Sequence, residues 1–67
     1  MHILLIEDDI NAASYVIKGL KESGHVVDHA SDGEEGMELS LTLKFDVIII
    51  ELVPVFTVVA NLLAPFN

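Results

Sequence analysis

The chain has 67 residues, a net charge of −8 and no cysteine. A chain of this length forms one small domain at most and buries only about 60% of its extended surface, and without cysteine it has neither disulfides nor thiolate zinc ligands to add stability. The excess of acid excludes a chain that holds nucleic acid through its phosphates, whereas 52% apolar residues is too many for an acidic disordered tail, so we expect a globular domain.

The first two predicted elements are a buried strand and an amphipathic helix. Residues 2–6 are a short apolar run, which is typical of a strand covered on both faces in a parallel sheet. Over residues 10–23, apolar side chains recur at the i, i+3, i+4 and i+7 spacing of a helix. Asp8 or Asp9 can cap the start of this helix, and Gly24 can end it.

Three further elements continue an alternating pattern. Residues 25–29 form a shorter candidate strand, and Ser31 and Glu34 have the spacing of a capping box for a helix over about residues 33–43. Residues 47–50 are all β-branched and predict a third strand. Strands that alternate with helices across short connections favour a parallel sheet with right-handed crossovers. We therefore predict an α/β fold, with a three-stranded parallel sheet in the order 2-1-3.

Acidic residues follow two strands that this order makes neighbours. Glu7 and Asp8 follow the first strand, and Glu51 follows the third. Neighbouring strands lie about 4.8 Å apart, and ligands bind at this edge of open α/β sheets. Close carboxylates repel one another unless a cation compensates, and oxygen ligands suit Mg²⁺. The pattern predicts a divalent-cation site, although Asp8 and Asp9 could instead only cap the helix, with Glu7 a solvated rim residue and Glu51 a charge that ends a strand.

Other motifs offer little chemistry. His25 and His29 lie about 13 Å apart on a strand, so they cannot share one metal ion, and we expect solvated surface histidines. Gly36 indicates close packing of the second helix. The sequence has no Gly-rich phosphate loop and no nucleophile motif of a hydrolase. We therefore do not expect an enzyme.

Four segments together resemble a known family. The stretches ILLIEDD, AASYVIKGLKESGH, ASDGEEG and FDVIII, in this order and spacing, resemble the N-terminal half of the receiver domain of two-component response regulators, especially the OmpR/PhoB-like winged-helix subfamily. The resemblance covers about residues 2–51 and implies a flavodoxin-like fold, of which residues 1–51 would be a βαβαβ half-domain. It also implies a sensor histidine kinase as partner, a cytoplasmic location and a parent protein that binds DNA to regulate transcription.

The resemblance assigns roles to the acidic residues. Glu7 and Asp8 match the acidic pair that binds Mg²⁺ in the family, Asp8 directly and Glu7 through water, and Asp9 is left as a cap. Glu51 matches the phosphoryl-accepting position, where the family has Asp. The extra methylene moves the carboxylate, and a misplacement of about 1 Å can cost on the order of 100-fold in rate. We expect Glu51 to be a poor acceptor, or a partial mimic of the phosphorylated state.

The resemblance ends near Glu51. Pro54 follows after two residues where the family has three, and no Asp-Gly pair comes after it. The later strands, with the Ser or Thr and the Lys expected on them, are missing, as are the dimerisation face and the DNA-binding domain. These departures predict a truncated or frameshifted receiver module.

Residues 52–67 form an apolar tail that carries none of the charges. A membrane span is not expected, because Glu51 and Pro54 interrupt the apolar run and no basic flank follows. Residues 55–63 could form a helix or strand that covers the open sheet edge, or could pair two chains. We expect self-association. The alternative function is a non-catalytic assembly protein that uses this tail as its interface, and a damaged gene product without function also stays open.

Overall fold

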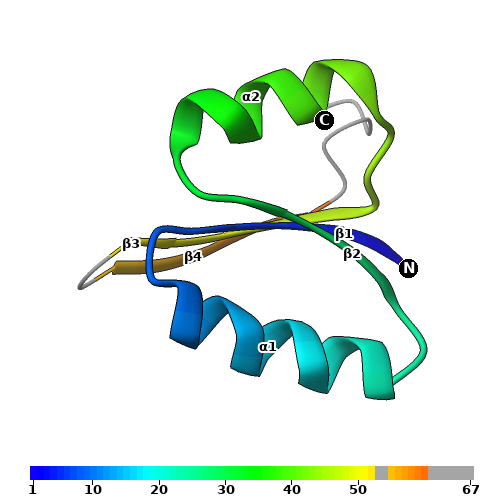
Figure 1. Ribbon diagram of the computed structural model, residues 1–67. Helices are drawn as coiled ribbons and strands as arrows, with labels where there is room; N and C mark the ends of the chain where they lie inside the picture. Colours follow the sequence, from blue (N-terminus) through cyan, green and yellow to red (C-terminus); the bar gives the residue numbers. More distant parts are fainter. Residues whose placement is uncertain (53–54, 61–67) are drawn as a thin grey trace.

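The computed structural model describes residues 1–52 and 55–60. In chain order its elements are β1 (His2–Glu7), α1 (Ile10–Glu22), β2 (Val26–Ala30), α2 (Gly33–Thr42), β3 (Val47–Leu52) and β4 (Val55–Ala60). The sheet has the order β2-β1-β3-β4, in which β1 pairs in parallel with β2 and β3. The two helices lie on opposite faces of the sheet (Figure 1). The flavodoxin-like half-fold with the parallel order 2-1-3 is confirmed.

The core is centred on β1, which is buried along nearly its whole length. Its apolar residues from Ile3 to Ile6 are at most 6% exposed. Leu4 and Ile6 belong to a cluster that also contains Ala30, Phe45 and Ile48, with Leu39 of α2 packed against it. Alternate residues of a strand face opposite sides, so Ile3 and Leu5 face the side that α1 covers. Burial on both faces explains why residues 2–6 are so uniformly apolar.

The ends of α1 follow the sequence signals. Asp9 is the N-cap, and its side chain accepts hydrogen bonds from the backbone N–H groups of Asn11 and Ala12 at 2.9 and 3.2 Å. Ser23 is the C-cap, and Gly24 follows with a φ of 88°. This left-handed conformation suits glycine and ends the helix. Of the two candidate caps, Asp9 is therefore the one used, which leaves Asp8 free of that role.

The start of α2 differs from the prediction. The expected capping box of Ser31 and Glu34 is wrong, because the N-cap is Asp32, whose side chain accepts from the Glu35 N–H at 2.8 Å. The helix begins at Gly33, so Asp32 is the residue that immediately precedes it. A carboxylate there also interacts favourably with the positive end of the helix dipole, which a serine hydroxyl does not match.

Among the described residues, the helices cover the β3–β4 half of the sheet less than the β1–β2 half, although Ile48 of β3 is buried in the core cluster. The backbones of both helices approach β1 and β2, and within residues 1–52 and 55–60 neither helix backbone comes close to β3 or β4. Residues 55–60 form the strand that the sequence left open against a helix, antiparallel to β3, so the sheet has four strands rather than three. Residues 61–63 of that predicted segment lie outside the described residues. No helix in the described part of the chain is long and apolar enough to cross a membrane.

The close approach of α2 to β1 depends on Gly36. This residue is buried, and a Cβ built on it would lie 2.8 Å from Ile6 Cγ1 and closer still to Ile6 Cδ1. Real Cβ atoms do not approach carbon atoms so closely, so Ile6 would have to move. The glycine therefore sets the distance between α2 and the core strand, as the sequence predicts.

We expect Gly36→Ala to lower the free energy of unfolding. Overpacking costs about 1–3 kcal/mol, and the better helix propensity of Ala offsets about 1 kcal/mol of it. Gly19→Ala is the matched control, because its Cβ meets no described atom within 4 Å, and it should raise stability by about 1 kcal/mol. Urea unfolding followed by circular dichroism measures both. If Gly36→Ala were as stabilising as Gly19→Ala, the packing account would be wrong.

Candidate functional site

The carboxyl edge of the sheet brings two of the predicted acidic residues together. Glu7 of β1 and Glu51 of β3 are paired in the parallel register, which places their Cα atoms about 4.8 Å apart. Asp8 follows directly in the turn between β1 and α1. The strand order therefore produces the convergence expected from sequence, and each carboxyl group has a different environment.

Glu7 is buried. Its exposed fraction is 1%, which makes it the buried charged residue of the described core. Oε1 accepts a hydrogen bond from the Asp9 N–H at 2.8 Å, whereas within residues 1–52 and 55–60 no donor reaches Oε2. The alternative of a solvated Glu7 is wrong, because β1 extends one residue beyond the predicted range and carries Glu7 into the core. A buried carboxylate oxygen without a donor is costly.

The pKa of Glu7 is raised above its ordinary value of 4.5. The hydrogen bond from the Asp9 amide favours the charged form and lowers the pKa. Burial and the neighbouring carboxyl groups of Asp8 and Glu51 act in the opposite direction, and together they outweigh the amide. Desolvation and like charge both disfavour ionisation. A cation beside Oε2 would reverse this balance.

The other two acidic residues can reach solvent. Asp8 is exposed, and Glu51 is half-buried. Because Asp9 supplies the cap of α1, the Asp8 carboxylate does not serve as the cap. Capping of α1 therefore does not explain why a carboxylate stands at Asp8, beside Glu7.

The oxygen atoms at this edge are of the kind that a hard cation takes as ligands. The edge offers a buried carboxylate oxygen without a partner, an exposed carboxylate beside it and a third carboxyl in register, and Mg²⁺ takes oxygen ligands while keeping several waters. In the described ranges, however, no group of three or more His, Asp or Glu side chains is gathered closely enough to hold a metal ion. The carboxylates are adjacent, and their side chains would have to turn toward a shared ion.

His29 supports this edge from β2, a role that the sequence did not indicate. Its Nε2 lies 2.8 Å from the backbone oxygen of Glu7 and donates to it. His29 is paired with Leu5 in the register of β1 and β2. Its Cα is therefore level with a residue two positions before Glu7, and the ring reaches along the strands to the Glu7 carbonyl. The contact between His29 and Glu7 depends on the strand register, which the sequence does not show. The expectation of a solvated His29 is wrong, because the residue is half-buried.

At the opposite end of the sheet, His2 of β1 contacts both β2 and the segment that precedes β3. Its Nε2 lies 2.6 Å from Asp28 Oδ2, and its Nδ1 lies 2.9 Å from the Lys44 carbonyl oxygen. Its ring centroid lies 4.5 Å from that of Phe45, and Asp46 Oδ2 accepts from its backbone N–H. These contacts are structural and lie away from the acidic edge.

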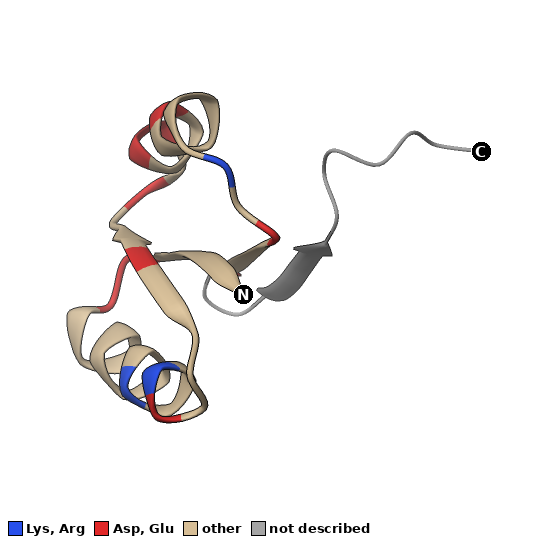
Figure 2. Cartoon of the chain, turned by 90° about the vertical axis from the view of Figure 1, so that its right-hand side faces the viewer, with Lys and Arg blue, Asp and Glu red and all other residues tan. Residues whose placement is uncertain are grey.

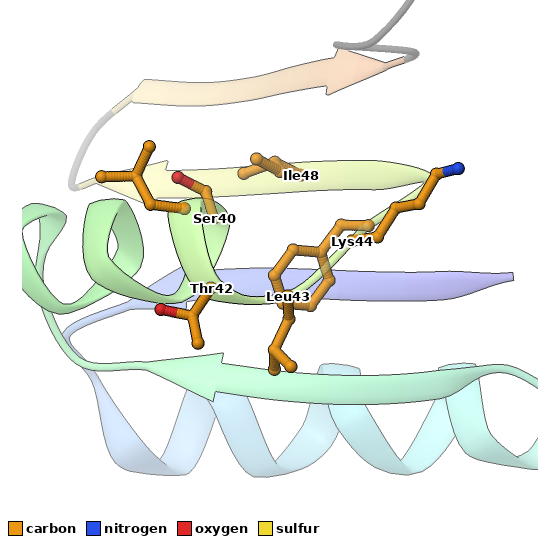
Figure 3. A pocket seen from close by; sticks show the side chains of 7 residues that line it. Ser40, Thr42, Leu43, Lys44 and Ile48 are labelled. Carbon is orange, nitrogen blue, oxygen red and sulfur yellow. The ribbon is translucent and has the colours of Figure 1, made fainter.

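A pocket beside α2 lies away from the carboxylates. It has a volume of about 370 Å³ and is lined by residues of the segment from the last turn of α2 to the start of β3. Figure 3 shows the Lys44 side chain extending away from the hydroxyls of Ser40 and Thr42. The pocket lies toward the beginning of β3, whereas Glu51 lies near its end. It therefore belongs to a different part of the fold from the acidic site.

The remaining charges surround the sheet. Figure 2 shows acidic positions on both helices and on the connecting segments. The lysines of the chain are Lys18 and Lys21 of α1 and Lys44, which follows α2. In the described part of the molecule, the one pair of a basic nitrogen and a carboxylate oxygen within 4 Å is His2 Nε2 with Asp28 Oδ2. Within residues 1–52 and 55–60, no basic nitrogen therefore lies within 4 Å of the carboxylates of the acidic edge.

The chain is similar to known transcriptional regulators. Over 52 residues it is 46% identical to SilR of Salmonella typhimurium, a probable transcriptional regulatory protein. It is 42% and 40% identical to HprR and CusR, transcriptional regulatory proteins of Escherichia coli strain K12. Each match covers 78% of this chain and 23% of the relative, so the chain spans less than a quarter of the length of these curated relatives. No protein-family model matches, and no solved structure gives a significant match.

The raised pKa of Glu7 predicts how stability depends on pH without metal. The folded state holds this proton more tightly than the unfolded state, so the contribution is fully present below pH 4.5 and is lost as the pH rises through the raised pKa. Glu7→Gln resembles the protonated form at every pH. We expect this variant to be more stable than wild type at pH 7 in a chelating buffer, with the difference vanishing below pH 4.5.

Urea unfolding at several pH values measures this difference. Glu38→Gln is the matched control, because Glu38 is an exposed residue of α2 and loses the same charge. A Glu7→Gln variant that was less stable than wild type at pH 7 would contradict the account of Glu7.

Proposed function

We propose that this chain, which over about its N-terminal 52 residues belongs with the OmpR/PhoB-type transcriptional response regulators, is a receiver-type module of two-component signalling. The similarity to named regulators confirms the family indicated by the sequence motifs. The module would bind Mg²⁺ at Glu7 and Asp8, with Glu51 at the phosphoacceptor position. One observation carries the proposal, namely the buried Oε2 of Glu7, which has no donor in the described structure and lies in register with Glu51.

A bound cation would offset the repulsion between the carboxylates of the acidic edge. Like-charged groups at close range repel, and burial of Glu7 strengthens this effect. Bound Mg²⁺ would supply the positive charge that phosphoryl transfer requires. The Asp9 amide holds Oε1 of Glu7, so Oε2 is the atom left for a metal-bound water. Asp8, which is exposed and adjacent, would supply the direct ligand.

Glu51 would act as a weak acceptor or as a fixed negative charge. It is half-buried near the end of β3, where the family has an aspartate nucleophile. Its extra methylene displaces the carboxylate from the position that in-line transfer requires, and transfer depends on positioning more than on covalent chemistry. We therefore propose slow phosphorylation, or partial imitation of the phosphorylated state, rather than efficient transfer.

The wider role is part of the same proposal. The relatives are transcriptional regulators rather than typical enzymes, and we propose that this chain is likewise not an enzyme. A sensor histidine kinase would be its partner, in the cytoplasm. The chain would not contact DNA by itself, because its net charge of −8 repels phosphates. Residues 1–51 would form the partial receiver, and residues 52–67 would be a tail outside the family pattern.

A second candidate function is a non-catalytic assembly protein. The observation that favours it is β4, which extends the sheet with residues that carry no charge and that no described helix covers. In this case the carboxylates would serve only as solubilising charge and as a helix cap. The response to Mg²⁺ separates the two functions.

We expect Mg²⁺ to stabilise the wild-type chain at constant ionic strength. At a free concentration of ten times its Kd, a ligand that binds only the folded state adds about 1.4 kcal/mol to the free energy of unfolding. Glu7→Gln with Asp8→Asn should abolish this gain, whereas Glu38→Gln on the exposed face of α2 should retain it. Urea unfolding with and without Mg²⁺ measures the effect. An equal gain in the double variant would place the cation elsewhere.

We also expect Glu51→Asp to restore phosphorylation. Acetyl phosphate with Mg²⁺ should add one phosphoryl group to this variant, and wild type should react on the order of 100-fold more slowly, because its carboxylate is displaced by about 1 Å. Intact-mass spectrometry over time measures both reactions. Glu51→Gln is the control that should gain nothing. If neither wild type nor Glu51→Asp reacted, the phosphotransfer role would be lost.

A further inference from the structure

Among the described residues, no strand pairs with the outer edge of β4. β4 pairs with β3 from Val55 opposite Leu52 to Ala60 opposite Val47, and it is the last strand in the sheet order, with no further strand beyond it among the described residues. Alternate backbone N–H and C=O groups of such a strand point away from the sheet. An edge of this kind is a template for another strand.

This edge lacks the usual protection. Edge strands are commonly guarded by charged side chains, Pro or bulges, whereas residues 55–60 contain no charge, no Gly and no Pro. The opposite edge of the sheet differs, because β2 carries Asp28, which is engaged by His2. The two edges are therefore chemically unlike, and β4 is the one suited to pairing.

The surroundings of β4 leave room for a partner. In the part of the chain that the structure describes, α1 and α2 pack on β1 and β2 and not on β4. The charged residues all lie between Glu7 and Glu51. Two copies that each carry −8 therefore repel least when they meet through the strand that has no charge.

We propose that β4 pairs antiparallel with β4 of a second copy of this chain. A two-fold axis through the middle of the strand makes the contact isologous, because wherever residue i of one copy meets residue j of the other, j of the first meets i of the second. The pairing satisfies the outward backbone groups of both edges and joins two four-stranded sheets into one. It also leaves the acidic edge of each copy free, so it goes beyond the proposed cation site and does not depend on it.

An extended peptide from another protein offers the same backbone chemistry. The uncharged edge gives no means of selecting a charged peptide, whereas a second copy is always present with a matching uncharged strand. The second copy is therefore the occupant that the charge distribution favours. A chain that is monomeric on its own would exclude it.

Thr57, a polar residue near the middle of β4, offers a substitution that opposes the pairing. In a two-fold antiparallel pair, Thr57→Lys brings two like charges close together across the axis, which is destabilising. We expect sedimentation velocity of the full chain to show a dimer for wild type and an increase of about fivefold in the dimer Kd for Thr57→Lys. Val26→Lys is the matched control, because Val26 is an exposed residue of the opposite edge strand. It should leave the Kd unchanged.

A charge exchange tests the pairing more sharply. Thr57→Lys and Thr57→Glu should each dimerise more weakly than wild type alone and should form a tighter mixed dimer when combined, since opposite charges then face each other. Circular dichroism of each variant checks that the fold is retained. Should either variant fail to fold, isotope-filtered NMR of mixed labelled and unlabelled wild type gives an independent test, because Hα atoms of β4 in the two copies should show contacts.

Three results would overturn the proposal. Wild type could remain monomeric at several hundred micromolar, Val26→Lys could weaken the dimer as much as Thr57→Lys does, or the contacts between copies could map to β2 or to the helices. Each result assigns the interface elsewhere or removes it. None of them bears on the Mg²⁺ response at Glu7 and Asp8, so failure of this proposal is distinguishable from failure of the proposed function.

Discussion

Burial of β1 on both faces is the constraint on which the rest of the structure depends. The strand lies between β2 and β3, with a helix on each side of the sheet, so its residues contact little but protein. Since the strand extends to Glu7, the same burial removes a carboxylate from water. The Asp9 amide satisfies one oxygen and leaves the other without a donor in the described structure. The site is therefore a consequence of the core rather than an addition to the surface.

Two parts of the sheet differ in charge and in their similarity to known proteins. One part, from β2 to β3, has the helices, the charges and the similarity to response regulators. The other part begins after Glu51, carries no charge, and adds β4 as an antiparallel strand beside β3. An acidic edge suited to a cation and an uncharged edge suited to a strand thus occur in one small sheet. They can act independently, because they use different atoms.

Most of the fold could be predicted from local patterns. The apolar run of residues 2–6 and the helical spacing of residues 10–23 determine their elements with little help from tertiary structure. The cap at Asp32 and the contact of His29 with Glu7 could not be predicted, since both depend on where a helix begins or on strand register. The segment 55–63 was ambiguous because an apolar run without periodicity suits helix and strand equally. At the site, convergence followed from strand order, whereas burial of Glu7 required the structure.

The central claim is that the acidic edge binds Mg²⁺, and a ¹H–¹⁵N correlation spectrum of the dilute chain with and without Mg²⁺ tests it most directly. The account predicts dispersed peaks, with shifts on adding Mg²⁺ confined to Glu7, Asp8, Glu51 and their immediate neighbours. Such a result would establish folding and the site together. Peaks that do not respond to Mg²⁺, or that shift evenly over the exposed acidic residues of α2, would contradict the claim.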